Sequence, residues 1–429
     1  MSLPSDANNP TRQPACNDAD RVRERWEKID PARFPHKPEV GSRQVPATIE
    51  NLQYLLRQYG ISVRYNVISK ELAISIPGHV GTVDNFENST LSRVISLCRL
   101  NGMRTSDVPD YLYAIGDLNL LNPVEDYITS KPWDGVSRLP DLYATVKLKE
   151  DFPPAFRDAL LFRWLLSTVA AATMRSGFRS RGVLTFQGPQ GIGKTRWLRA
   201  LIDNEVLGNS VIKVDHHLDG GDKDSILSAI GHWLVELGEL ESSLRKDVAR
   251  LKGFITADFD KVRRPYDRKE SKYPRRTVFM ATVNDLEFLV DPTGNSRFWV
   301  IPVIGLDYNH GIDMQQVFAE LYVLLQAGEQ WWLTDEEEAM LAKHNRDHRS
   351  TSAVKDKVMG LLDLSLLGRP ENKQMSATEV LEAADFRNPT NAMARECGSL
   401  LRELGITATT VHGIAKYRVP LIRGGKRSS

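Results

Sequence analysis

One stretch, residues 183–198, constrains this chain more than any other. It reads Val-Leu-Thr-Phe-Gln-Gly-Pro-Gln-Gly-Ile-Gly-Lys-Thr-Arg-Trp-Leu, and Gly188, Gly193, Lys194 and Thr195 fit the pattern G-x-x-x-x-G-K-[ST]. The apolar residues before the loop predict a strand, and residues 196–202 predict a helix. A phosphate-binding loop requires this strand-to-helix context.

The residue types in this loop have a physical reason. Glycines allow a tight turn and a close approach of the backbone to a phosphate, while the helix that follows directs free N–H groups at the anion. Lys194 reaches the terminal phosphates, and Thr195 faces a magnesium ion. The predicted nucleotide-binding residues are Gly188, Pro189, Gln190, Gly191, Ile192, Gly193, Lys194 and Thr195. The sequence therefore predicts an NTP-binding protein with magnesium as its metal.

Composition limits the other classes of function. Among 429 residues, 41% are hydrophobic and 26% are charged, which is ordinary for a soluble globular protein. We find neither an apolar run that could cross a bilayer nor a targeting segment at the start, so we expect a cytoplasmic protein without a membrane partner. The net charge of +1 means that any nucleic-acid contact must come from local clusters. Cys16, Cys98 and Cys397 are too far apart to form a metal or redox pair, which leaves buried or incidental thiols.

Before the phosphate loop, the composition of the chain changes near residue 46, from a proline-rich segment to one with helix and strand patterns. Residues 1–45 are rich in proline and poor in large apolar residues, so we expect a poorly ordered segment apart from a short helix over residues 20–29. Residues 46–145 predict a small accessory α/β domain. Its expected elements are a helix near residues 49–56, strands over 61–66 and 72–76, and a helix over 90–101.

Residues 146–345 predict the nucleotide-binding domain. A long apolar helix is expected over residues 156–174, directly before the strand that leads into the loop. After the loop, strands alternate with helical segments, which favours a parallel sheet with helices on its faces. The expected strands are residues 210–215, 232–239, 276–284 and 297–303.

Polar side chains at the strand ends are the candidate catalytic residues. Hydrolysis of a nucleotide needs acids beside the loop, one for the magnesium shell and one for the attacking water. Glu236 and Glu239 follow a strand of suitable length and are preferred, with Asp215 as the competing candidate. Asn284 ends the next strand and could sense the terminal phosphate, and Arg297 lies in a Gly/Pro turn from which a neighbouring subunit's nucleotide could be reached.

Residues 261–276 form a basic cluster with eight cationic and two acidic side chains and two tyrosines. Cations that follow phosphates and rings that stack on bases suit single-stranded DNA. A solvated surface loop is the alternative. The predicted DNA-binding residues are Lys261, Arg263, Arg264, Tyr266, Arg268, Lys269 and Lys272.

The C-terminal residues 353–422 predict a winged-helix-like domain. Ser376 can cap a helix that runs to Ala384, and a second helix is expected over residues 389–404. Strands over 406–411 and 415–419 then form a hairpin. DNA contact through this domain and a purely structural or protein-binding role are both open. The basic candidates for DNA contact are Arg395, Arg402, Lys416 and Arg418.

Together these motifs resemble the virulence-associated protein E family of phage, prophage and plasmid ATPases, which is similar to the superfamily 3 helicases of the AAA+ class. The matching stretches, within residues 120–340, include Gly188–Thr195, Trp233–Leu240, Arg264–Tyr266, Thr282–Asn284 and Thr293–Trp299. The resemblance implies a ring-forming ATPase, often hexameric, that moves along single-stranded DNA during replication of a mobile element.

The resemblance also implies roles for single residues. It assigns ATP and magnesium to Lys194 and Thr195, and the acidic motif to Glu236 and Glu239, with Glu236 on the metal. Asn284 becomes the first sensor and Arg297 the arginine finger. The two acids are separated by two residues here but are adjacent in the broader helicase pattern, so their division of labour stays open.

The expected function is therefore that of an ATP-dependent DNA helicase or translocase, with replication-origin DNA as a possible ligand of the C-terminal domain. The alternative is an ATP-binding initiator or regulatory switch that assembles on DNA without unwinding it. The basic loop and the C-terminal domain disfavour a third class, a P-loop kinase of small molecules. The predicted fold is α/β, with a P-loop NTPase core of the AAA+ and superfamily 3 type between the two smaller domains.

Overall fold

A computed structural model describes most of the chain. The described residues are 26–79, 85–219, 222–238, 253–262, 270–284, 295–345, 353–411 and 414–422. The chain divides into two compact units, Met1–Pro123 and Val124–Ser429. No helix among the described residues is both long and apolar enough to cross a membrane.

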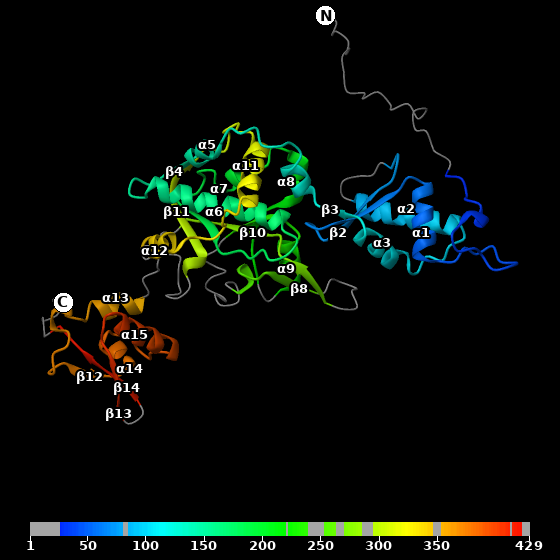
Figure 1. The fold of residues 1–429 in the computed structure, drawn as a ribbon. Helices are drawn as coiled ribbons and strands as arrows, with labels where there is room; N and C mark the ends of the chain where they lie inside the picture. Colours follow the sequence, from blue (N-terminus) through cyan, green and yellow to red (C-terminus); the bar gives the residue numbers. More distant parts are fainter. Residues whose placement is uncertain are drawn as a thin grey trace, which may run out of the picture. The chain divides into compact units, whose positions relative to one another are not determined.

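The N-terminal unit combines a small sheet with three helices (Figure 1). Its strands are β1 (Ser62–Asn66), β2 (Glu71–Ser75) and β3 (Leu120–Leu121), and its helices are α1 (Ile49–Gln58), α2 (Phe86–Leu100) and α3 (Val108–Asp117). Strand β1 lies in the middle, antiparallel to β2 and parallel to β3. Leu52, Leu55 and Leu56 recur at helical spacing on α1 and are buried. The predicted α/β pattern of this region is confirmed.

The expectation of poor order over residues 1–45 is wrong for the part that the structure describes. Residues 26–30 are not helical, and a short 3-10 helix covers Pro31–Arg33. Phe34 and Val45 are buried in the core of the N-terminal unit. The backbone N–H of His36 also donates to Asn51 Oδ1 at 2.8 Å. The proline-rich composition concealed these few apolar anchors, which pack onto distant helices.

The second unit is built on a six-stranded sheet. Its strands, in spatial order, are β4 (Val146–Leu148), β11 (Phe298–Leu306), β5 (Val183–Gln187), β10 (Val278–Val283), β7 (Leu234–Leu237) and β6 (Ile212–His216). Strand β4 pairs antiparallel with β11, and the other pairings are parallel. The predicted parallel sheet is therefore confirmed, and the carboxyl ends of β5, β10 and β7 lie side by side.

Helices cover this sheet. Those that contact its strands include α5 (Leu139–Ala144), α6 (Pro154–Thr173), α7 (Lys194–Arg199), α8 (Glu205–Val211) and α12 (Asp335–His344). The same part of the chain also contains α4 (Pro123–Ile128), α9 (Lys223–Ile230) and α11 (Met314–Gln326). Helix α6 packs against β5, β10 and α11 (Figure 1). Trp164 of α6 is buried, and its indole N–H donates to Phe279 O of β10 at 2.9 Å. The long apolar helix predicted before the loop thus anchors the sheet.

The boundary between the units falls earlier than the sequence analysis placed it. Side chains of α11 hold residues 128–138 against the core. Gln315 donates to the carbonyl oxygens of Ile128 and Lys131, and Glu320 accepts from the backbone N–H of Arg138. The break after Pro123 replaces the expected break near residue 145 because these buried polar side chains bind a segment that is distant in sequence.

The C-terminal residues 353–422 contain helices and an antiparallel sheet. The elements are α13 (Ala353–Met359), β12 (Lys373–Met375), α14 (Ala377–Ala383), α15 (Asn391–Glu403), β13 (Ala408–Val411) and β14 (Ile414–Val419). Ser376 caps α14 as predicted, in a capping box with Glu379, and Thr390 caps α15. Strand β12 pairs with β14 and was not foreseen, because three residues carry too little alternation to predict a strand.

Packing at the start of β5 makes a specific stability prediction. A Cβ atom on Gly182 would lie 2.2 Å from ring atoms of the buried Trp299. Gly182→Ala is therefore expected to lower the unfolding free energy by about 1–3 kcal/mol through overpacking. Thermal unfolding of the full chain measures the effect. Gly253→Ala is the matched control, since its Cβ would meet nothing within 4 Å. An unchanged melting temperature for Gly182→Ala would contradict the described contact.

Candidate active site

The loop after β5 has the geometry expected of a phosphate-binding loop. Gly193 caps α7 with a φ of +97°, a conformation that favours glycine. At Gly188, a Cβ atom would lie 2.2 Å from the carbonyl oxygen of Val303. Both positions therefore require glycine for reasons of space or backbone conformation. The strand–loop–helix context predicted from the sequence is confirmed.

Lys194 links the loop to the neighbouring strand. Its side chain is buried, and its Nζ donates to Gly188 O at 2.6 Å and to Val283 O at 3.1 Å. It also donates to Asn284 Oδ1 at 2.8 Å. Asn284 follows β10, so the parallel pairing of β5 and β10 brings together two candidates that are 90 residues apart in sequence. An anionic ligand would compete with these neutral acceptors for the ammonium group.

Glu236 is the acid that the fold brings to the loop. The Thr195 hydroxyl donates to Glu236 Oε1 at 2.7 Å, and the Glu236 side chain is almost fully buried within β7. A hydroxyl and a carboxylate in contact are the type of oxygen donor that Mg²⁺ prefers. The predicted partner acid, Glu239, lies outside the described residues.

Asp215, the competing acid, lies at the same end of the sheet. Its backbone N–H is 3.4 Å from Glu236 Oε2, and its φ of +51° is unusual for a residue other than glycine. The register between β6 and β7 shifts here, so the strand bulges at this point. Burial lowers the pKa of the adjacent His216 to about 4, with Lys213 adding to the effect. His216 is therefore neutral at pH 7 and brings no positive charge to these acids.

Arg297 lies at the opposite edge of the sheet from the loop. The next residue, Phe298, pairs with Val183 at the start of β5, whereas the loop follows the end of that strand. A five-residue strand separates the two places, a distance on the order of 15 Å. The fold therefore does not bring Arg297 to the phosphate loop of its own chain.

Two further arginines share the surroundings of Arg297. Arg179 and Arg181, just before β5, line a pocket of about 200 Å³ together with Arg297. The remaining lining residues are Thr256, Ser296, Trp299, Leu333 and Glu338. The sequence analysis missed both arginines, although an Arg-Ser-Arg run directly before the loop strand was a visible signal. Three guanidinium groups around one pocket suit an anionic ligand.

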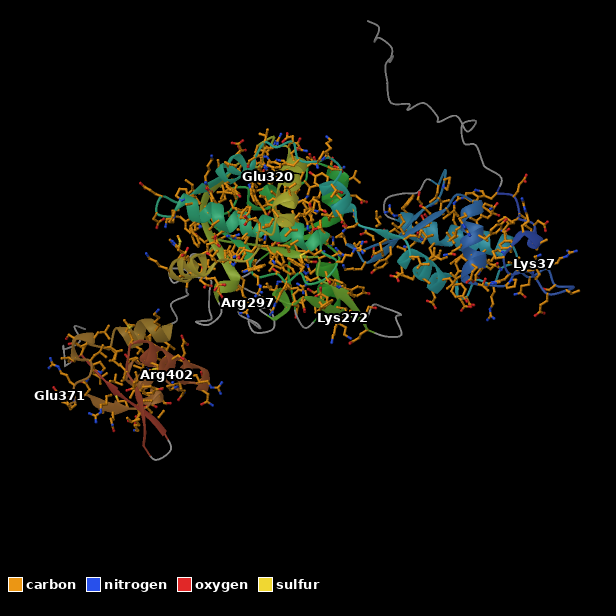
Figure 2. All side chains as sticks on the ribbon, viewed as in Figure 1. Lys37, Lys272, Arg297, Glu320, Glu371 and Arg402 are labelled. Atoms are coloured by element: carbon orange, nitrogen blue, oxygen red, sulfur yellow. The ribbon has the colours of Figure 1, made fainter. Side chains whose placement is uncertain are left out.

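The basic run between β7 and β10 forms a hairpin. Strands β8 (Phe259–Val262) and β9 (Ser271–Pro274) pair antiparallel, with Lys261 directly opposite Lys272. Both lysines are exposed, and Lys272 is labelled in Figure 2. Its ammonium lies 3.6 Å from the centre of the Phe259 ring. Like charges directly across a strand pair are unfavourable, so an anion here would relieve repulsion. The predicted contacts Arg263, Arg264, Tyr266, Arg268 and Lys269 lie outside the described residues.

Two arginines of the predicted basic run are not available to DNA. Arg275 is buried in an ion pair with Asp260. Arg276 donates to Ala172 O at 2.6 Å, and burial lowers the pKa of its guanidinium. The sequence analysis included both among the eight cationic side chains of residues 261–276 that suit DNA binding. For these two arginines that interpretation is wrong. The exposed basic residues of the described hairpin are Lys261 and Lys272.

Three of the four basic candidates in the C-terminal region make internal contacts. Arg402 donates to the Tyr417 hydroxyl, Lys416 contacts both carboxylate oxygens of Glu379, and Arg418 donates to a backbone carbonyl. Arg395 is exposed on α15. Within the described residues, the contacts given above thus involve Arg402, Lys416 and Arg418 but not Arg395.

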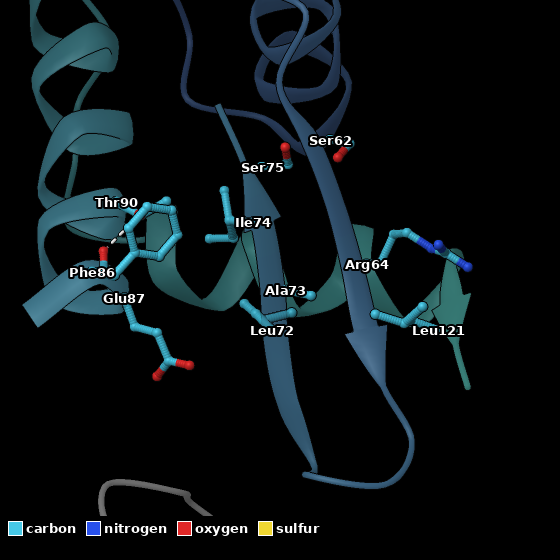
Figure 3. Close-up of a pocket in the computed structure, with 10 residues that line it drawn as sticks. All are labelled: Ser62, Arg64, Leu72, Ala73, Ile74, Ser75, Phe86, Glu87, Thr90 and Leu121. Atoms are coloured by element: carbon cyan, nitrogen blue, oxygen red, sulfur yellow. Dashed lines mark hydrogen bonds between the residues drawn. The ribbon is translucent and has the colours of Figure 1, made fainter. Parts of the chain in front are cut away.

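Two wider hollows flank β1 in the N-terminal unit, with volumes of about 410 and 610 Å³. Figure 3 shows the smaller one, whose lining includes Ser62, Arg64 and Ser75 of the sheet and Phe86 and Glu87 of α2. None of the predicted site residues lines either hollow. Their size alone does not make them candidate active sites, because the chemistry described above lies at the edge of the larger sheet.

A comparison with protein-family models identifies the family of this chain. The model of the virulence-associated protein E-like domain matches residues 128–350, which include the loop, Glu236, Asn284 and Arg297. The chain belongs to the virulence-associated protein E-like family. The resemblance noted in the sequence is thereby confirmed. A search of curated proteins found no match.

Solved structures of the NrS-1 C-terminal region share a weak likeness with this family member. One, described as the A form apo structure, is 14% identical and covers 86% of this chain and 99% of that chain, with a TM-score of 0.46. Another, an apo structure of residues 305–718, is 15% identical and covers 86% and 98%, with a TM-score of 0.38. TM-scores this low do not establish a shared fold.

Proposed function

We propose that this chain is an ATP-dependent DNA helicase or translocase that acts in replication of a phage, prophage or plasmid-type mobile element. The proposed core is a P-loop ATPase of the AAA+ and superfamily 3 type. One observation carries the proposal: Lys194, Asn284 and the Thr195–Glu236 contact meet at one edge of a parallel sheet. Phosphoryl transfer relies on such positioning and charge stabilisation.

ATP and Mg²⁺ are the proposed ligands. The loop backbone and Lys194 would bind the phosphates, while Thr195 and Glu236 supply the oxygen donors that fit magnesium. The metal would neutralise charge on the phosphate oxygens. Asn284 holds the Lys194 ammonium and is proposed to sense the terminal phosphate. Glu239 is the proposed second acid, with Asp215 as the alternative.

Arg297 is proposed to act on the nucleotide of a neighbouring subunit. Its place at the opposite sheet edge supports action between subunits, since the strand length separates it from its own loop. Arg181 lines the same pocket and makes no hydrogen bond or ion pair within the described residues, so it is proposed to assist. A closed homo-oligomer, in the family's manner a hexameric ring, would place each pocket against the next subunit's loop.

Single-stranded DNA is the proposed partner of the hairpin, and replication-origin DNA that of the C-terminal domain, which we interpret as winged-helix-like. The opposed Lys261 and Lys272 support the first assignment. For the second, the support is the order of helices and hairpin, with Arg395 accessible on α15. In a helix-turn-helix the second helix of the pair contacts the bases, and α15 takes that place after α14.

Removing the two hairpin lysines is expected to weaken DNA binding and its dependence on salt. Affinity falls with salt, and each phosphate contact on a single strand contributes about −0.7 to the slope of log affinity against log salt. Lys261→Ala/Lys272→Ala should therefore make the slope less negative by about 1.4. Fluorescence anisotropy with a labelled oligonucleotide over a salt series measures it. Lys149→Ala, another exposed lysine of the core, serves as the control. An unchanged slope would remove the hairpin strands from the proposed DNA contact.

Strand displacement separates the proposed motor from the switch that assembles without unwinding. The experiment uses the full chain, ATP and a forked duplex with single-stranded tails. A motor separates the strands only when ATP is hydrolysed, so Lys194→Ala must be inactive. Hydrolysis that is stimulated by DNA but displaces no strand would favour the initiator or switch.

A further inference from the structure

The base of the basic hairpin contains a buried ion pair that the proposed chemistry does not use. Asp260 of β8 faces Arg275, which directly follows β9. Arg275 Nε donates to Asp260 Oδ2 at 2.8 Å, and Nη2 donates to Oδ1 at 2.5 Å. The relative exposure of the two residues is only 1% and 5%. The hairpin is therefore closed at its base by a bidentate pair inside the protein.

Further contacts hold the guanidinium in one position. Nη2 also donates to the carbonyl oxygen of Phe254 at 2.9 Å. The guanidinium carbon lies 4.5 Å from the Phe254 ring centre and 5.6 Å from that of Phe279. Hydrogen bonds and aromatic contacts thus come from the hairpin, from the segment before it and from β10.

Stability alone does not account for this pair. Removing two charges from water is costly, and apolar side chains of similar volume often serve equally well in such places. Within the described residues, the buried Nη1 has no hydrogen-bond partner, which adds to the cost. A costly, rigid and directional contact at the root of a candidate DNA-binding hairpin points to a role in positioning.

The same residue is close to the candidate nucleotide site along the chain. Arg275 is three residues before β10, and Phe279, which its guanidinium contacts, belongs to that strand. At its other end, β10 leads to Asn284, whose side chain accepts from Lys194 Nζ. Strand β10 therefore connects Arg275, at the base of the hairpin, to Asn284, which contacts Lys194.

We propose that the Arg275–Asp260 pair is a positioning joint that transmits the state of the nucleotide site through β10 to the DNA-binding hairpin. The inference rests on the proposed function, because it requires a nucleotide at Lys194 and DNA at the hairpin. Neither residue touches a ligand. Their effect is to make the hairpin move with β10 instead of independently of it.

The test replaces the pair by apolar side chains in the full chain, as Asp260→Leu/Arg275→Met, which avoids leaving one charge buried alone. Asp134→Leu/Arg138→Met is the control, because it removes a bidentate pair that is partly exposed and lies outside the hairpin. Three readouts are measured: DNA-stimulated ATP turnover, affinity for a labelled oligonucleotide, and hydrogen exchange of residues 259–262 and 271–274 with and without ATP.

The double variant is expected to melt as the wild type does, to bind the oligonucleotide with wild-type affinity and to keep its turnover without DNA. Its stimulation by DNA should fall at least about fivefold, the lower end of typical coupling factors. The ATP-dependent change in hairpin exchange should disappear as well. Where DNA stimulates the wild type, equal stimulation in the double variant would overturn the inference. A parallel loss of DNA affinity would also overturn it, because the pair would then only support the hairpin.

Hydrogen exchange separates this inference from the proposed function. If wild-type turnover ignores DNA but ATP changes the hairpin exchange in the wild type and not in the variant, the DNA motor is wrong and the joint stands. If ATP leaves the wild-type hairpin exchange unchanged, the joint is wrong even when DNA stimulates turnover.

Discussion

Replacing Lys194 with alanine is expected to abolish ATP hydrolysis. The ammonium group already lies between the loop and Asn284, where the terminal phosphates of a bound nucleotide would replace its carbonyl partners. Loss of one preorganised donor at such a place typically lowers kcat by about 10²–10³-fold. Release of inorganic phosphate at saturating ATP measures the effect.

The interpretation requires that Lys194→Ala remains folded. The side chain also donates to Val283 O, so thermal unfolding is recorded alongside turnover. Lys223→Ala, an exposed lysine at the start of α9, should hydrolyse ATP at the wild-type rate. Normal turnover in a folded Lys194→Ala protein would refute the assignment of the loop as the catalytic nucleotide site.

Arg297→Ala is expected to lower turnover by about 10³–10⁵-fold, the range found for arginine fingers. The reason is its place at the end of the sheet opposite the loop, which supports the proposed action on a neighbouring subunit's nucleotide. Mixing Arg297→Ala with Lys194→Ala should then restore part of the activity. Some interfaces in the mixture combine an intact Lys194 from one subunit with an intact Arg297 from the next.

Mixing distinguishes a trans-acting arginine from a structural one. Phosphate release is followed as the ratio of the two variants is changed at constant total protein. Arg104→Ala, an exposed arginine of the N-terminal unit, is the control and should behave as the wild type. If Arg297→Ala is inactive and mixing restores nothing, the arginine supports the fold around its pocket and is not a finger.

The sequence predicted the loop, the parallel strands and their polar ends because these features are local. Alternation of apolar segments fixed the strands, and parallel pairing then placed Asn284 beside Lys194 without further information. The start of β6 was misplaced by two residues. Asn204 caps α8, and that helix continues to Val211, so the apolar residues there are helical instead of extended.

The remaining features depend on contacts between distant parts of the chain. In the sequence, Arg275 cannot be distinguished from the basic residues around it. The structure shows that it is buried in an ion pair with Asp260. Arg179 and Arg181 meet Arg297 because β5 and β11 are neighbours in the sheet. Residues 26–45 look disordered by composition, yet Phe34 packs into a core formed largely by later residues. Patterns within one segment carry no signal for such contacts.

The most direct test of the proposed motor is steady-state ATP hydrolysis by the purified chain without DNA, with single-stranded DNA and with duplex DNA. Lys194→Ala is measured under the same conditions. The proposal predicts strong stimulation by single strands, weaker stimulation by duplex and no turnover in the variant. If DNA does not change wild-type turnover, a translocating motor is contradicted. The hairpin of β8 and β9 would then be interpreted as an ordinary solvated surface.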